Sequence, residues 1–118
     1  MLDLIIKNGK CYIDGQLKDV NISVKDGKIL KIGRITEDAK DTIDATGLIV
    51  LPGCMDTQTH FREPGSTDTE DLNSGSRAAI AGGITSVFEM PNTNPPTSTK
   101  KEFQRKLDLA KNRMYCNY

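Results

Sequence analysis

One stretch, residues 47–65, constrains the fold of this chain more than any other. It opens with a short apolar strand, Leu48–Leu51, which ends at Pro52-Gly53 because proline lacks the N–H that a strand ladder needs. A second extended segment, Cys54–Thr59, leads directly into His60, the only histidine of the chain. Polar, ligand-type side chains that gather where a strand gives way to a loop are typical of sites in α/β proteins.

Residues 1 to about 50 have the pattern of short strands joined by tight turns. Pairs that favour hairpin turns stand at Asn8-Gly9, Asp14-Gly15 and Asp26-Gly27. Apolar and polar residues alternate over residues 20–25, as in a half-buried strand. Turns at this spacing predict an antiparallel β layer, and we interpret the segment as scaffold.

After residue 60 the sequence pattern predicts helices as well as strands. Thr67 or Thr69 is expected to cap a helix whose first turn holds two acidic residues, the favourable sign at a helix N-terminus. The glycine pair Gly82-Gly83 is expected to end this helix.

The remaining residues predict a strand, a second helix and the start of another strand. The segment Ile84–Glu89 is rich in β-branched and aromatic residues. Thr99–Glu102 has the capping-box pattern and precedes an apolar stripe of Phe103, Leu107 and Ala110. Met114–Tyr118 begins a further strand. Strand, helix, strand, helix and strand in alternation predict a parallel sheet, with His60 and Asn92 at the carboxyl ends of neighbouring strands.

The residues around His60 resemble a known family. Alternation along a strand places Asp56, Gln58 and His60 on one face. The segment resembles the Asp-x-His-x-His pattern with which metal-dependent amidohydrolases bring two imidazoles to one metal, with Gln58 in place of the first histidine. The runs His60–Gly65 and Glu89–Pro96 resemble dihydroorotase more closely than hydantoinases or allantoinases. Those relatives look similar around the histidines but do not generally carry an arginine in the position of Arg62.

The resemblance covers essentially the whole chain, as the N-terminal part of a longer protein. The fold class that we expect is α/β: an N-terminal antiparallel β layer followed by the first strands and helices of an incomplete TIM-type (β/α)8 barrel. A barrel of this type takes about 250 residues, so the chain holds roughly two of its eight units. We expect residues 1–53 to form the small β domain and residues 54–118 to start the barrel.

The resemblance implies reversible opening of the cyclic amide of dihydroorotate to carbamoyl aspartate in pyrimidine biosynthesis, with a metal-activated water as the nucleophile. Zinc is the expected cofactor and His60 its best ligand. Gln58 is a weaker ligand than an imidazole. Arg62 and Asn92 are the expected substrate-binding residues, holding the carboxylate of the substrate. The other ligands and the general acid or base would come from later strands, so this segment alone should not catalyse.

Each of these side chains also has a structural interpretation. His60 is alternatively a hydrogen-bonded structural histidine. Arg62 could form a surface ion pair with Glu63 or Asp68, and Asn92 could be a turn residue between prolines.

Two other functions remain open from the sequence. One is a related cyclic amidohydrolase of the hydantoinase or allantoinase type. The other is a non-catalytic relative that serves as a scaffold subunit of aspartate transcarbamoylase, which Gln58 favours. The expected partners are therefore the small-molecule substrate and either a second copy of the protein or aspartate transcarbamoylase.

Composition narrows the kinds of partner and the cellular environment that we expect. Sixteen basic and sixteen acidic residues give no net charge, which argues against nucleic acid as a partner. No apolar run approaches the ~20 residues of a membrane helix, so no membrane association is expected. The three cysteines are far apart and form no Cys-x-x-Cys pair, which favours a reduced, cytoplasmic protein without a structural zinc site or disulfides.

Overall fold

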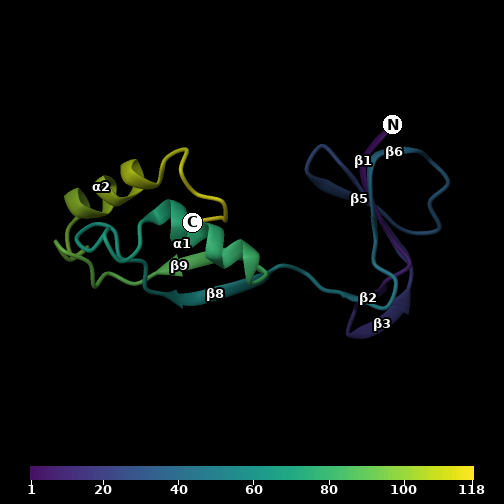
Figure 1. Cartoon of the computed structure of the whole chain (residues 1–118), viewed down its shortest axis with the longest axis horizontal. Coiled ribbons are helices and arrows are strands. Elements are labelled where there is room, and N and C mark those ends of the chain that lie inside the picture. Colours follow the sequence, from purple (N-terminus) through teal and green to yellow (C-terminus); the bar gives the residue numbers. More distant parts are fainter. The chain divides into compact units, whose positions relative to one another are not determined.

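The structure is a computed structural model that describes all residues, 1–118. The chain forms two compact units, Met1–Pro52 and Gly53–Tyr118 (Figure 1). Neither of the two helices has the length and apolar character that crossing a membrane requires.

The first unit contains only strands: β1 (Leu2–Lys7), β2 (Lys10–Ile13), β3 (Gln16–Asp19), β4 (Asn21–Lys25), β5 (Lys28–Gly33), β6 (Ala39–Asp44) and β7 (Ile49–Val50). They form two sheets, with the orders β5-β4-β1-β6 and β3-β2-β7. The buried side chains include Ile5, Cys11 and Ile22, and they form the interior of this unit.

Two of the three predicted hairpins are confirmed. Asp14-Gly15 joins β2 to β3 and Asp26-Gly27 joins β4 to β5, and all four residues have the positive φ that a two-residue hairpin turn requires. The third prediction is wrong: β1 pairs with β4 and β6, and β2 pairs with β3 and β7. Asn8-Gly9 therefore passes the chain from one sheet to the other.

The prediction of a purely antiparallel layer is also wrong. β1 pairs with β6 in parallel, and β2 pairs with β7 in parallel. Parallel partners are joined by long connections. Local alternation gives no signal for a partner that lies more than 30 residues away in the chain, as Asp41 does from Leu4.

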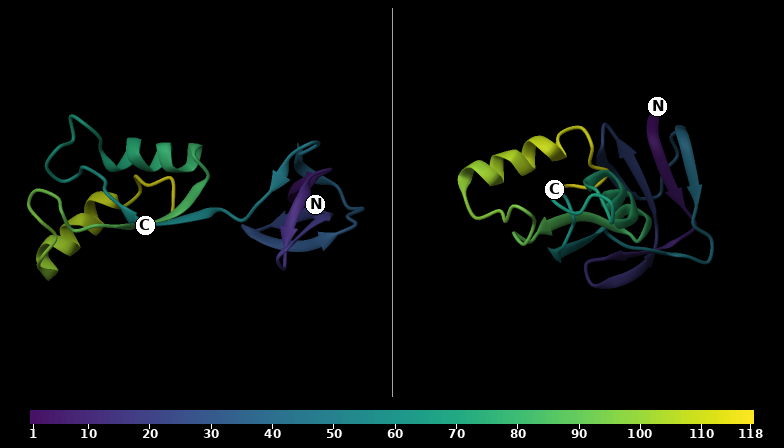
Figure 2. Two further views of the ribbon diagram at one scale, coloured as in Figure 1. Left: turned by 90° about the horizontal axis from the view of Figure 1, so that it is seen from below. Right: turned by 60° about the vertical axis from the view of Figure 1, so that its left-hand side comes forward.

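The second unit consists of β8 (Cys54–Thr59), α1 (Leu72–Ala81), β9 (Ile84–Glu89) and α2 (Lys100–Ala110). β8 and β9 are paired in parallel, as expected, and α1 lies between them in the chain (Figure 2). At the predicted last strand there is one parallel bridge, Ser86 with Asn117. Phe61, Leu72, Val87, Ala110 and Cys116 form the buried core of the unit.

The start of α1 differs from the prediction. Its N-cap is Asp71, whose carboxylate accepts a hydrogen bond from the Ser74 N–H at 2.7 Å. Thr69 instead belongs to a turn in which its N–H donates to the Ser66 carbonyl. The acidic residue expected inside the first turn therefore caps the helix, a position that aspartate favours.

The end of α1 and the start of α2 agree with the prediction. Gly82 is the C-cap of α1, and Gly83 has a positive φ. Thr99 caps α2 and accepts a hydrogen bond from the Glu102 N–H at 3.2 Å. On α2, Ala110 is buried but Phe103 and Leu107 are exposed, so the expected apolar stripe is only partly covered.

Candidate functional site

His60 and Asn92 meet where β8 and β9 end. His60 follows β8 directly, and Asn92 follows β9 after two residues. The Nδ1 of His60 lies 2.8 Å from the Oδ1 of Asn92. Both residues are exposed. The structure therefore brings together two of the predicted site residues at the carboxyl edge of a parallel pair, the position where α/β sites form.

The loops that carry these two residues are joined by backbone contacts. The Met90 N–H donates to the Thr59 carbonyl at 2.8 Å, and the Asn94 N–H donates to the Pro64 carbonyl at 3.0 Å. A Cβ added to Gly65 would lie 2.6 Å from the Cβ of Asn94, and the φ of Gly65 is +118°. Gly65 thus permits a close approach that a larger residue would prevent.

The strand before His60 is irregular. Between Asp56 and Thr59 the pairing with β9 shifts, so that β8 has one extra residue. The Asp56 carboxylate accepts a hydrogen bond from the Gln58 N–H at 2.9 Å. The expectation that Asp56, Gln58 and His60 share one face rested on regular alternation. Because a bulge interrupts that alternation, the argument does not hold over this segment.

As a zinc site the chain is incomplete. No group of three histidine, cysteine, aspartate or glutamate side chains is close enough to hold a metal ion. His60 alone fits such a site chemically, because its hydrogen bond to Asn92 occupies Nδ1 and leaves Nε2 free. This segment can therefore contribute one imidazole, with Gln58 nearby in the chain, and the other ligands would have to come from elsewhere.

Arg62 is exposed, and its guanidinium forms no ion pair. The surface ion pair considered for it forms neither with Glu63, which is bound by Arg113, nor with Asp68. The Arg62 side chain therefore remains available to an anionic group.

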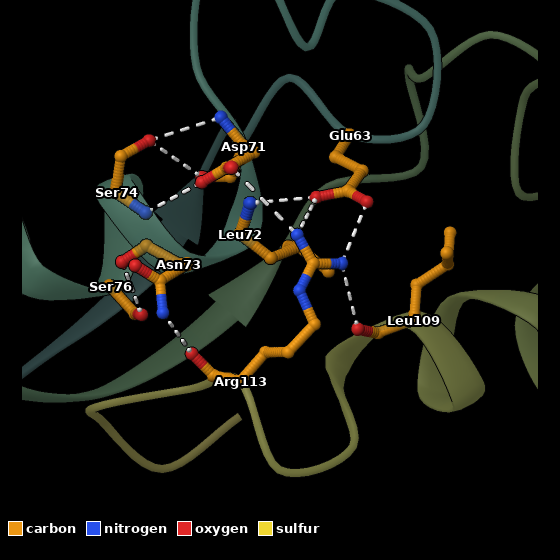
Figure 3. A network of polar contacts seen from close by, with 8 residues as sticks. All are labelled: Glu63, Asp71, Leu72, Asn73, Ser74, Ser76, Leu109 and Arg113. Atoms are coloured by element: carbon orange, nitrogen blue, oxygen red, sulfur yellow. Dashed lines mark hydrogen bonds and ion pairs between the residues drawn. The ribbon is translucent and has the colours of Figure 1, made fainter.

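Glu63 is the centre of a polar network that links its own loop to the start of α1 and to Arg113, which follows α2 (Figure 3). Arg113 Nη1 and Nη2 donate to Glu63 Oε1 and Oε2 at 2.8 and 2.9 Å, and the Leu72 N–H donates to Oε2 at 2.9 Å. Arg113 also donates to the Leu109 carbonyl and lies 3.8 Å from the Asp71 carboxylate. The hydrogen bonds from Arg113 hold the pKa of the Glu63 carboxyl below its ordinary value.

The role of Glu63 cannot be read directly from the sequence. The partner is separated from it by 50 positions, and no local pattern relates the two residues. The one feature that points to Glu63 is its place shortly before a helix, where an acidic side chain can accept a hydrogen bond from one of the first N–H groups of that helix.

An ion pair with both side chains buried joins α2 to the end of β9. Lys106 Nζ is 3.3 Å from Glu89 Oε2, and the Tyr118 hydroxyl donates to the same oxygen at 2.6 Å. Burial raises the pKa of the Glu89 carboxyl. These three residues line a pocket of ≈ 270 Å³ together with Phe88 and Phe103. This contact holds α2 against the end of β9. None of the predicted site residues takes part in it.

Known proteins with similar sequences include bacterial allantoinases. An allantoinase of Escherichia coli O1:K1 is 47% identical over 113 residues, which cover 95% of this chain and 25% of the allantoinase. The allantoinase of Salmonella choleraesuis (strain SC-B67) is 46% identical over the same length. The chain thus spans about a quarter of the length of these relatives.

Solved structures lead to the same group of proteins. The L-hydantoinase (dihydropyrimidinase) of Arthrobacter aurescens matches with a TM-score of 0.86 and 36% identity, over 98% of this chain and 26% of that one. A D-hydantoinase of a Thermus species matches with a TM-score of 0.80 and 28% identity, over the same shares. The family model described as the amidohydrolase family matches residues 49–116, more than half of this sequence. The chain therefore belongs to the amidohydrolase family.

Proposed function

We propose that the full-length protein is a cyclic amidohydrolase that opens a hydantoin-type ring, with allantoin as its substrate. The pair His60 and Asn92, at the carboxyl ends of two parallel strands, is the observation on which this proposal rests. The similarity to allantoinases and hydantoinases supports the ring type, and it favours this substrate over dihydroorotate. In this proposal, residues 54–118 begin a (β/α)8 barrel that the rest of the protein completes.

We further propose zinc as the cofactor. When bound, zinc supplies the Lewis acidity that water attack on an amide carbonyl requires. This chain would contribute the Nε2 of His60, held in position by Asn92, while Arg62 would face the anionic or polar groups of the substrate. Gln58 lies two residues before His60 and would take the place of a second imidazole.

The test uses the full-length protein. We expect bound zinc by elemental analysis and hydrolysis of allantoin, and we expect the variant His60→Ala to lose more activity than the about 10–100-fold typical of a change outside the ligand set. Arg105→Ala, on the exposed face of α2, is the control. A wild-type protein with neither zinc nor turnover on any cyclic amide would contradict the proposal and favour the scaffold function.

Dihydroorotase activity is the second candidate, and the free guanidinium of Arg62 favours it. Dihydroorotate carries a carboxylate that a planar guanidinium can bind with two hydrogen bonds, whereas hydantoin is neutral. If dihydroorotate is the substrate, Arg62→Ala should raise its KM by at least about tenfold, equivalent to about 1.4 kcal/mol, and change the KM for hydantoin little. Equal effects on both substrates would contradict a carboxylate-binding role.

A further inference from the structure

The hydrogen bond between His60 and Asn92 determines which ring nitrogen carries the proton. The atom of Asn92 that faces the ring is its amide oxygen, at 2.8 Å from Nδ1. An amide oxygen can only accept a hydrogen bond, so Nδ1 must be the protonated nitrogen of the neutral imidazole. The lone pair is then on Nε2, the nitrogen that Asn92 does not contact.

Asn92 is held in place by its own loop. The Thr97 N–H and the Thr93 N–H both donate to the Pro91 carbonyl, at 2.8 and 2.9 Å, and the Thr93 hydroxyl donates to the Pro95 carbonyl at 3.0 Å. These contacts close the chain on either side of Asn92. The amide therefore reaches His60 from a fixed backbone and not from a freely moving loop.

His60 is restrained from its side as well. It follows β8, whose last residue, Thr59, accepts a hydrogen bond from the Met90 N–H. The neighbouring hydrogen bond from the Asn94 N–H to the Pro64 carbonyl joins the two loops. The geometry of the pair thus depends on the parallel strands themselves.

We propose that Asn92 is a positioning residue that holds His60 as the Nδ1–H tautomer, so that Nε2 is the nitrogen presented to the reacting site. This role differs from the expected one, in which Asn92 binds the carboxylate of the substrate. The step from tautomer to metal ligation rests on the proposed function, but the tautomer itself does not.

The single histidine of the chain makes the test direct. In the ¹⁵N-labelled 118-residue chain, at a pH where imidazole is neutral, long-range ¹H–¹⁵N spectra report the two ring nitrogens of its one histidine, His60. All spectra are compared in a background with Phe103→Gln and Leu107→Gln, which removes exposed apolar side chains that favour self-association. We expect a protonated Nδ1 and an unprotonated Nε2. Asn92→Ala should shift the ring toward the Nε2–H form that free histidine favours.

Two further variants separate positioning from general disturbance. Asn92→Asp should keep the Nδ1–H form, because a carboxylate also only accepts hydrogen bonds. Asn94→Ala, a neighbouring asparagine whose side chain makes no hydrogen bond, should leave the spectrum as in wild type. A wild-type spectrum dominated by the Nε2–H form, or an Asn92→Ala spectrum identical to wild type, would overturn the proposal.

Zinc binding by the full-length protein separates this proposal from the proposed function. Asn92→Ala should weaken zinc binding by about 10–100-fold, and Asn92→Asp should restore it. If the tautomer shifts as expected but the wild-type protein binds no zinc, the positioning role stands and the proposed function fails. If zinc binding and hydrolysis are normal while the tautomer does not depend on Asn92, the positioning role fails and the proposed function stands.

Discussion

The carboxylate of Glu63 is bound on both of its oxygens, and the residue itself is 7% exposed. It follows His60 and Arg62 closely in the chain, so its anchoring restricts the backbone that carries both. The ion pair is buried on the carboxylate side only, since the Glu63 side chain is 9% exposed and the Arg113 side chain is 35% exposed. Removal of Arg113 would therefore leave a buried carboxylate without its partner. At the scale of single residues, Glu63 and Arg113 therefore determine the local geometry of the site loop.

We predict that Glu63→Gln destabilises the second unit by about 1–3 kcal/mol near neutral pH, because hydrogen bonds to a charged group are replaced by weaker ones. The pKa of Glu63 is lowered in the folded state, so its contribution is complete above its ordinary pKa. That contribution is lost as the pH falls through the lower, folded-state pKa. Hydrogen exchange of the β9 amides, measured over this acid range, should show a steeper loss of protection in wild type than in the variant.

Glu70→Gln serves as the control, since the Glu70 side chain makes no hydrogen bond or ion pair. It should leave both the stability and its acid dependence close to wild type. Equal acid dependence in wild type and Glu63→Gln would show that the Glu63 ion pair does not contribute to stability as described.

Helix α1 illustrates how packing overrides propensity at the scale of an element. Gly75 lies inside α1 and is buried. A Cβ built there would lie 2.7 Å from two ring carbons of Phe61, the residue that follows His60. The glycine thus lets the helix approach the loop that carries the site residues.

We predict that Gly75→Ala destabilises the second unit, although glycine to alanine within a helix normally stabilises by up to about 1 kcal/mol. The added methyl group must displace Phe61, and overpacking of this kind typically costs about 1–3 kcal/mol. Gly82→Ala, at the C-cap, is the matched control, since its nearest atoms lie at 3.5 Å. Thermal denaturation should show a lower Tm for Gly75→Ala than for Gly82→Ala; the opposite order would contradict the packing argument.

The strands of the second unit could be predicted from the sequence more closely than the start of α1. Pro52-Gly53 precedes β8 and Gly82-Gly83 precedes β9, and both strands have the predicted bounds because these breakers leave little freedom. The cap of α1 was misplaced because several capping residues stand close together before the helix, and only the turn at Ser66 decides among them. The parallel pairings of the first unit depend on distant residues and leave no local signal.

At the scale of the whole molecule, the site also depends on contacts between residues that are distant in the sequence. Sequence alone indicated His60 and Asn92 as site residues, but not their contact with each other, which depends on the pairing of β8 with β9. The motifs around His60 and Arg62 pointed to dihydroorotate as the cyclic amide, whereas the similar proteins are allantoinases and hydantoinases. The residues that fasten the site loop, Glu63 and Arg113, became visible only in three dimensions.

We predict that the 118-residue chain self-associates at micromolar concentration. Large apolar side chains are exposed on the second unit, among them Phe88, Phe103 and Leu107. Exposed apolar patches of this kind drive association. The double variant Phe103→Gln and Leu107→Gln on α2 should reduce association in sedimentation velocity experiments without a large change in Tm. The control is Arg105→Gln on the same helix, and a monodisperse wild-type monomer would contradict the prediction.

The ion pair between Glu63 and Arg113 also has a consequence for how the protein is made. Fifty positions separate the two residues, so the ribosome adds Arg113 long after Glu63 has been incorporated. Until then, the guanidinium that binds both oxygens of this carboxylate in the folded chain is missing. The loop with His60 and Arg62 therefore reaches its final shape only after α2 has been synthesised and has folded back onto α1. A pause in translation within α2 would prolong the period in which this loop is unanchored.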